Sequence, residues 1–207
     1  MNTASHRLYY QRFWFVFLTA ALLLSAACGG KSVSRRDSDE AIDLSGRWND
    51  TDSQMVSTAM IKDSLTWPWI DQWRQRTGRN PVVMAYGVKN GTSEHINTQT
   101  FMKDLERAFL KSGRVSVVAD TAQREKVREE RADQQSGLVG NPAAIGKELG
   151  ADFVLTGVIN SIEDEEDGDK VVFYQTNLDL INVTTNEKVW IGDKKIKKYI
   201  SKSKFKF

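Results

Sequence analysis

Few residues of this chain have side chains that could act as a nucleophile, a general base or a metal ligand. The sequence holds one cysteine, Cys28, and two histidines, of which only His95 lies beyond the N-terminal leader. A Ser–His–Asp triad would have to use His95, and the Gly-x-Ser-x-Gly motif that surrounds many such serines is absent. A zinc site built from several cysteines or histidines is excluded by the same counts. The residues therefore favour a protein that is not an enzyme and that needs no cofactor or metal.

The acidic run from Glu163 to Asp169 is a second place where chemistry could reside. If Gly168 takes the sixth position of an EF-hand loop, the position of the bidentate Glu falls on Tyr174, so the calcium register fails. We interpret the run as a solvated hairpin tip, with weak binding of a divalent cation as the alternative. Paired carboxylates of the kind that glycosidases use are not singled out by their setting.

The first 27 residues predict a signal peptide, and Cys28 predicts a lipid anchor. A basic start with Arg7 and Arg12 precedes the short apolar run Phe13–Leu24 and the small residues Ser25–Ala27. The run is shorter than the roughly 20 residues of a membrane span. Cys28 follows at the expected cleavage site and resembles the acylated cysteine of a bacterial lipobox, although Ser25 stands where a Leu is usual. By that resemblance the chain is anchored in the outer membrane on its periplasmic face.

Residues 28–43 predict a lipidated, flexible tether, because they are small and polar and can bury little surface. About 15 residues reach roughly 50 Å when fully extended. The folded domain is expected over residues 44–199, with a basic tail over residues 200–207.

Periodicity in the N-terminal half of that domain predicts mainly helices. Alternation of Ile42, Leu44 and Trp48 indicates a first strand, and Asp52 or Ser53 is expected to cap the first helix. Further helices are expected from Pro68 to Gly78, from Asn97 or Thr98 to Gly113, over 121–133 and over 142–149, with strands over 81–88 and 115–118. Three Trp lie within seven residues, Trp67, Trp69 and Trp73; their helical spacing favours core packing over a ligand platform.

The C-terminal half predicts an antiparallel meander. An apolar strand is expected over 151–159, and Asp167-Gly168 is a strong hairpin signal. Alternate positions of the returning strand are apolar or aromatic, which predicts one buried face and one polar face: Val172, Tyr174, Thr176, Leu178 and Leu180. A last strand is expected at 188–191. The fold class is therefore α+β, a mainly antiparallel sheet with helices packed on it.

Four stretches together carry a resemblance to a known family: Leu44–Asp52, Asn90–Thr98, Gly150–Gly157 and Lys188–Lys198. They resemble the LpoB-type outer-membrane lipoproteins, which activate class A penicillin-binding proteins, and the domain is similar to the TolB amino-terminal type. The resemblance implies a non-catalytic regulator of cell-wall synthesis with a peptidoglycan synthase as its partner. Peptidoglycan itself is a further candidate partner. The alternative is a structural or assembly lipoprotein with the same head, acting in envelope or appendage biogenesis.

The departure from that family is the tether, which is short and lacks the proline-rich linker of well-known members. It bears on the identity of the partner rather than on the fold.

Two surfaces are candidates for partner binding. The loop Asn90–Asn97 joins a strand to a helix, and its polar candidates are Asn90, Thr92, Glu94 and His95. Tyr174 with the polar strand face Gln175, Asn177 and Asp179 is the second candidate. The alternatives are turn and cap hydrogen bonds for the loop, and a plain solvated face for the strand.

The net charge of +2 is unevenly distributed along the chain. From Lys194 onward there are seven Lys and no acid, whereas the part between the leader and Lys194 is strongly acidic. The basic stretch could contact anionic lipid head groups or peptidoglycan. Nucleic acid is not an expected partner, because an exported protein rarely meets any.

Overall fold

The computed structural model describes residues 32–38, 40–137, 139–144 and 146–201. The chain divides into two units, Met1–Glu40 and Ala41–Phe207. The described part of the first unit holds no helix or strand. The predicted signal peptide and Cys28 lie outside the described residues.

The second unit is built on a five-stranded mixed sheet in the order β2-β1-β3-β4-β5. The strands are β1 (Val82–Asn90), β2 (Ser116–Val118), β3 (Phe153–Glu166), β4 (Asp169–Asn182) and β5 (Lys188–Ser201). β1 pairs in parallel with β2 and β3, whereas β3, β4 and β5 form the predicted antiparallel meander. The predicted α+β class is confirmed, with the difference that the sheet is mixed rather than mainly antiparallel.

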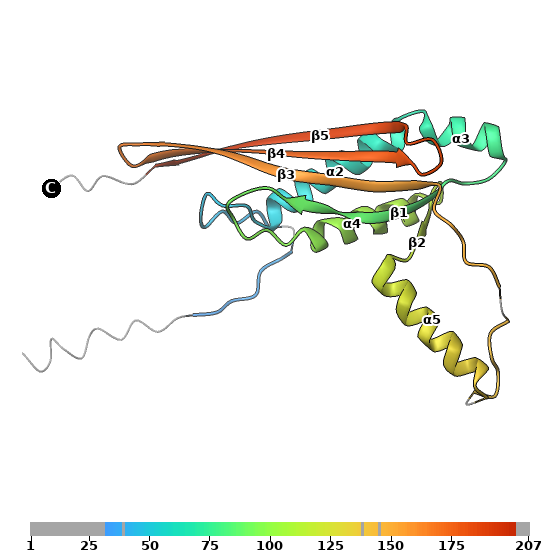
Figure 1. Ribbon diagram of the computed structural model, residues 1–207. Helices are drawn as coiled ribbons and strands as arrows, with labels where there is room; N and C mark the ends of the chain where they lie inside the picture. The colour runs from blue at the N-terminus through green and yellow to red at the C-terminus, as the bar shows by residue number, and fades with distance from the viewer. Residues whose placement is uncertain (1–31, 39, 138, 145, 202–207) are drawn as a thin grey trace, which may run out of the picture. The chain divides into compact units, whose positions relative to one another are not determined.

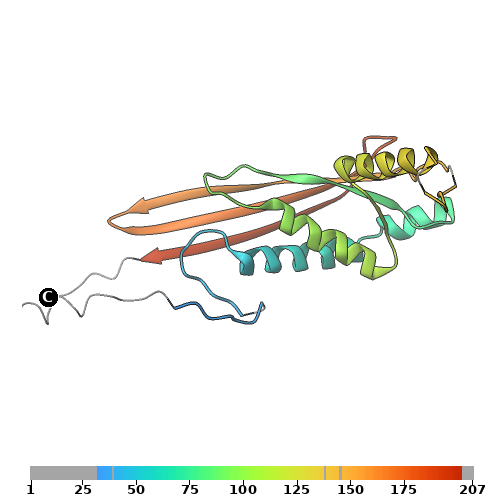
Figure 2. The ribbon, with the colours of Figure 1, turned by 90° about the horizontal axis from the view of Figure 1, so that it is seen from below.

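Helices cover one face of this sheet. α2 (Asp50–Thr66) and α4 (Thr98–Ser112) pack side by side against it, and α3 (Trp69–Thr77) follows α2 near the start of β1 (Figures 1 and 2). The fourth helix, α5 (Thr121–Gln135), extends away from the sheet and buries none of its residues (Figure 1). The other face of the sheet is left uncovered by α2 and α4.

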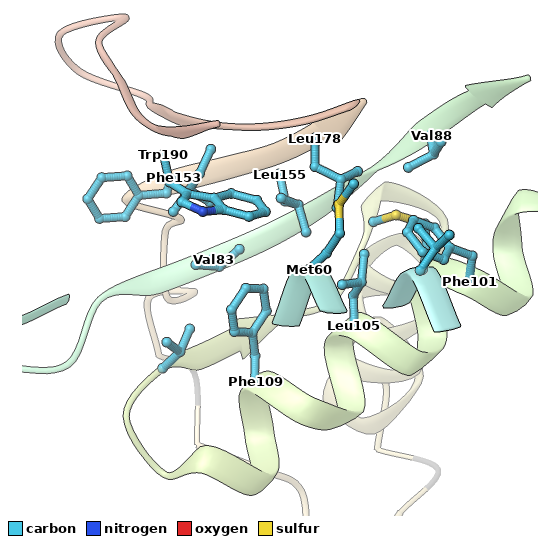
Figure 3. Close-up of a cluster of buried hydrophobic side chains, with 14 of the residues drawn as sticks. Met60, Val83, Val88, Phe101, Leu105, Phe109, Phe153, Leu155, Leu178 and Trp190 are labelled. Atoms are coloured by element: carbon cyan, nitrogen blue, oxygen red, sulfur yellow. The ribbon is translucent and has the colours of Figure 1, made fainter. Parts of the chain in front are cut away.

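The core forms where the helices meet the covered face. Met60 of α2 and Leu105 and Phe109 of α4 point toward Leu155 and Leu178 of the sheet (Figure 3). Trp69 is buried, and both Trp69 and Trp73 stand edge-on to Phe153, with ring centroids 5.3 and 4.9 Å apart. Core packing therefore explains these two aromatic rings, as their helical spacing predicted, while Trp67 remains partly exposed.

Three local predictions are corrected. The stretch from Ile42 to Trp48 is not a strand but a series of bends. Its polar groups bond to side chains of distant segments rather than to a neighbouring strand. The cap of α2 is Asn49, which forms a capping box with Asp52, so the helix begins earlier than predicted. No helix forms in the described residues of 142–149, where Gly146 would occupy the helix interior and weaken it.

Candidate functional site

The loop between β1 and α4, residues Gly91–Asn97, is shaped by bonds within itself. The Asn90 amide donates to the Glu94 carbonyl at 2.7 Å, and its oxygen accepts from the Thr92 hydroxyl at 2.8 Å and from the Thr92 N–H at 3.0 Å. The Glu94 N–H donates to the Thr92 hydroxyl. Asn97 then caps α4 by accepting from the Gln99 N–H. Asn90 and Thr92 thus make the turn hydrogen bonds that the alternative interpretation predicted.

Glu94 is the residue through which this loop contacts β4 and the segment that precedes α2. One carboxylate oxygen accepts from the Tyr174 hydroxyl of β4 at 2.6 Å, and the other accepts from the Trp48 N–H at 2.9 Å. The rings of Trp48 and Tyr174 meet edge to face, with centroids 5.5 Å apart. The Trp48 indole donates to the Ser53 hydroxyl of α2 at 2.7 Å. Three segments that are distant in sequence are thereby joined at one carboxylate.

The segment Asp43–Asn49, called the strap below, is held at a second point by β5. The Lys198 ammonium lies 2.6 Å from Asp52 and 3.1 Å from Asp43, and it also donates to the Arg47 carbonyl. Asp52 is almost fully buried, so its charge needs this partner. A Cβ on Gly46 would overlap the side chain of Ile200, so the strap crosses the end of β5 closely.

Burial and hydrogen bonding shift the titration of these groups. Burial, followed by the hydrogen bond to Glu94, raises the pKa of the Tyr174 hydroxyl far above its ordinary value, so Tyr174 is a permanent donor. Burial alone would lower the pKa of Lys198, but its bonds to Asp52 and Asp43 outweigh this and raise it. The bond to Lys198 and then that to Asn49 lower the pKa of Asp43. Tyr174 and Lys198 are therefore protonated and Asp43 is ionised at neutral pH, as their hydrogen bonds require.

The predicted partner-binding residues divide into internal and exposed ones. Tyr174 is fully buried, and Asn90, Thr92 and Glu94 are half-buried with bonds inside the domain. His95 is exposed, between the inward-facing Glu94 and the buried Ile96. The binding of a partner by these five residues stays a prediction, and His95 is the one that presents its side chain outward.

The uncovered sheet face carries the second candidate surface. Gln175, Asn177 and Asp179 alternate with the buried residues of β4 and are half-exposed. Ile162 of β3 is 68% exposed on the same face, opposite Phe173. The face is a mixture of polar and apolar side chains, so an interaction there would use both.

The acidic run forms the β3–β4 hairpin, as predicted. Glu163 bonds to Lys170 across the hairpin and accepts from the Ser93 hydroxyl at 2.7 Å, which ties the Gly91–Asn97 loop to β3. Among the described residues no group of three or more His, Cys, Asp and Glu is arranged to hold a metal ion. Within the described part of the chain, no helix is both long enough and apolar enough to cross a membrane.

Sequence reasoning missed two participants, Trp48 and Lys198. Local alternation predicts a strand at Trp48, and Lys198 belongs to the basic C-terminal stretch. Their partners lie 46 and 146 residues away along the chain. The signal available in the sequence was the presence of both residues in stretches that resemble the family.

The model of the family described as "Peptidoglycan-synthase activator LpoB" matches residues 52–196. The chain belongs to the LpoB family. The match covers α2 to β5 and includes the Gly91–Asn97 loop and Tyr174. A comparison with curated protein sequences gives no match.

Solved structures similar to this LpoB-family chain include two LpoB C-terminal domains. The domain from Salmonella enterica is 17% identical with a TM-score of 0.37, over 73% of this chain and 99% of that one. The domain from Escherichia coli is 21% identical with a TM-score of 0.36, over 68% and 96%. A lipoprotein from Neisseria meningitidis is 13% identical with a TM-score of 0.38, over 60% and 88%. Membership of the LpoB family rests on the family match.

Proposed function

We propose that this chain is an outer-membrane lipoprotein, anchored through acylated Cys28, that docks on a class A penicillin-binding protein and activates it from the periplasmic side. The observation that carries the proposal is the match of residues 52–196 to a family of peptidoglycan-synthase activators. The leader and Cys28 supply the anchor, and the domain supplies the docking surface.

An activator of this kind acts as an allosteric ligand. It needs no catalytic group, but it must bind the active state of the synthase more tightly than the inactive state. A rigid surface suits this task, because a preorganised ligand loses little entropy on binding. The Gly91–Asn97 loop fits this requirement, since its turn bonds and the Glu94 contacts hold it in one conformation.

The exposed side of this loop is the proposed docking surface. His95 is exposed, whereas its neighbours Glu94 and Ile96 are half-buried and buried, so the loop presents the His95 side chain to a partner. The polar face of β4, with Gln175, Asn177 and Asp179, is a second proposed contact. Tyr174 contributes indirectly by holding Glu94.

The short tether limits where docking can occur. About 15 residues between Cys28 and the domain span at most roughly 50 Å. The synthase is expected in the opposite membrane, so docking requires that its periplasmic domains reach toward the outer membrane. Lengthening the tether with a Gly/Ser insert tests this limit directly.

The test is photo-crosslinking in intact cells with a crosslinking amino acid at position 95. Capture of a class A penicillin-binding protein supports the proposal. Capture of assembly or secretion components alone supports the alternative of a structural lipoprotein and contradicts our proposal. The matched control places the same amino acid at Lys126, an exposed position of α5.

The same surface is tested by substitution. We expect His95→Ala to reduce stimulation of the purified synthase by about tenfold, the effect of losing roughly 1.4 kcal/mol of binding free energy. Lys126→Ala should leave stimulation unchanged. Full stimulation by the His95→Ala variant would remove His95 from the docking surface.

A further inference from the structure

The strap follows the predicted tether in sequence, and it contacts the loop that carries His95. Trp48 is its last residue but one, and its backbone N–H donates to Glu94 of the loop. At the other end of the strap, Asp43 bonds to Lys198 of β5. Residues 28–43 form the predicted tether, so any displacement of the tether reaches the strap first.

We propose that the strap positions the Gly91–Asn97 loop through Glu94 and acts as a latch, so that releasing the strap from β5 also releases the loop. The proposal concerns contacts within the domain and stands whether or not the loop docks on a synthase.

The Glu94 carboxylate couples the strap to the loop. Its two oxygens accept from two segments, the strap and β4, and each oxygen has a different donor. If the strap leaves, one oxygen loses a charge-assisted bond in a half-buried setting, which costs more than an ordinary hydrogen bond. Loss of the strap also removes the edge-to-face contact between Trp48 and Tyr174. The loop side chain and the strap are therefore stabilised together.

The position of Glu94 determines how His95 is presented. His95 is exposed between two inward-facing neighbours, Glu94 and Ile96. The bonds of Asn90 and Thr92 shape the turn, but they reach only the backbone of Glu94 and not its side chain. When these side-chain bonds are lost, Glu94 can rotate outward, and the backbone that precedes His95 is no longer held in place.

The strap is held more weakly than the core, which suits a latch. Its hydrogen bonds and ion pairs are polar, and Trp48 is its one side chain packed against the core, whereas α2, α4 and the sheet bury many large apolar side chains. Such segments open at lower free energy than the global unfolding of a domain. The structure shows the strap closed, and the proposed open state breaks these polar contacts while the core of α2, α4 and the sheet stays packed.

Hydrogen exchange on the mature chain, measured without any synthase, tests the coupling. Gly46→Val places a branched side chain where even a Cβ overlaps Ile200, and the three nearest neighbours of that Cβ all belong to Ile200 rather than to the loop. We expect this variant to speed exchange about tenfold in both 43–49 and 91–97. Gly140→Val is the matched control, because a Cβ there meets nothing within 4 Å, and it should leave both segments unchanged.

A second variant probes the coupling from the other side. Tyr174→Phe leaves the ring in place but removes the 2.6 Å bond to Glu94 and the longer 3.4 Å bond to the Gly46 carbonyl of the strap. We expect faster exchange in both segments again. A circular dichroism spectrum that matches the wild type serves as the check that the variants fold.

Three results would overturn the latch. Gly46→Val could speed exchange in the strap but not in the loop, it could alter neither, or it could speed exchange equally throughout β3 and β4. The proposed function is tested separately by synthase stimulation in the same variants. Coupled exchange with unaltered stimulation would keep the latch and remove the loop from the docking surface.

Discussion

At the scale of single residues, Glu94 organises the candidate site. Its carboxylate accepts from Tyr174 and from Trp48, and its backbone closes the turn that begins at Asn90. A charged acceptor makes stronger hydrogen bonds than a neutral one, and Tyr174 donates from a fully buried position. The contribution of Glu94 to order in the loop is therefore measurable through its donors.

Removing the Tyr174 hydroxyl should destabilise the domain. We expect Tyr174→Phe to lower the free energy of unfolding by about 2 kcal/mol, since a hydrogen bond to a charged group contributes roughly 1.5–3 kcal/mol. Denaturant unfolding measures the difference. Tyr86→Phe is the matched control, because Tyr86 is strongly exposed, and it should change stability by less than about 0.5 kcal/mol. If Tyr174→Phe were as stable as Tyr86→Phe and the wild type, the hydrogen bond from Tyr174 to Glu94 would not be formed in solution.

At the scale of elements, α2 links the strap to the core. Asn49 ends the strap and caps α2 through the Asp52 N–H, and the Asp52 carboxylate accepts from the Asn49 N–H in return. Val56 and Met60 of the same helix are buried in the core. The carboxyl end of the strap is therefore fixed to a helix that is itself packed in the core.

The capping box predicts a defined loss of stability. Asn49→Ala should lower the free energy of unfolding by about 1 kcal/mol, the usual cost of deleting an N-cap side chain. Thermal unfolding followed by circular dichroism measures this, and the midpoint should fall by several degrees. Asn49→Ser keeps a capping oxygen and should lie near the wild type. A Ser variant as unstable as the Ala variant would argue against the cap as the cause.

At the scale of the whole domain, charge pairs join the strap, β5 and the hairpin. The lowered pKa values of Asp43 and Glu163 mean that their stabilisation is present above the ordinary carboxyl pKa and is lost as the pH falls through the lowered values. The raised pKa of Lys198 means that its stabilisation is present below about pH 10 and is lost as the pH rises beyond its raised value. The contribution of these groups to the free energy of unfolding is therefore constant over a wide pH range around neutrality.

The pH dependence of the strap follows from these signs. We expect the NMR signal of the Trp48 indole N–H to stay constant from about pH 5 to 9 and to shift only below about pH 4 or above about pH 10. The Trp69 indole, which donates to the neutral Ser64 carbonyl, is the internal reference. If the chemical shift of the Trp48 indole instead changed with a midpoint near neutral pH, Asp43 and Lys198 would not be the charged groups that hold the strap.

The sequence predicted the faces of the meander well. Val172, Tyr174, Thr176, Leu178 and Leu180 are all buried, as their alternation required. Alternation in a strand is local, because successive side chains point to opposite faces whatever the strand pairs with. The Asp167-Gly168 turn, both with positive φ, was readable for the same reason.

The tertiary structure decided what the strap is. Alternation of Ile42, Leu44 and Trp48 predicted a strand, but these residues form bends whose partners are Glu94, Lys198 and the Ile200 side chain. These contacts join residues between 46 and more than 150 positions apart, and no local pattern encodes such pairings. The sequence by itself determined the strand faces, the hairpin and the resemblance of four stretches to a family. Only the packing of α2, β4, β5 and the loop brought three of those stretches together around Glu94 and Lys198, because burial of the core determines which distant polar groups meet.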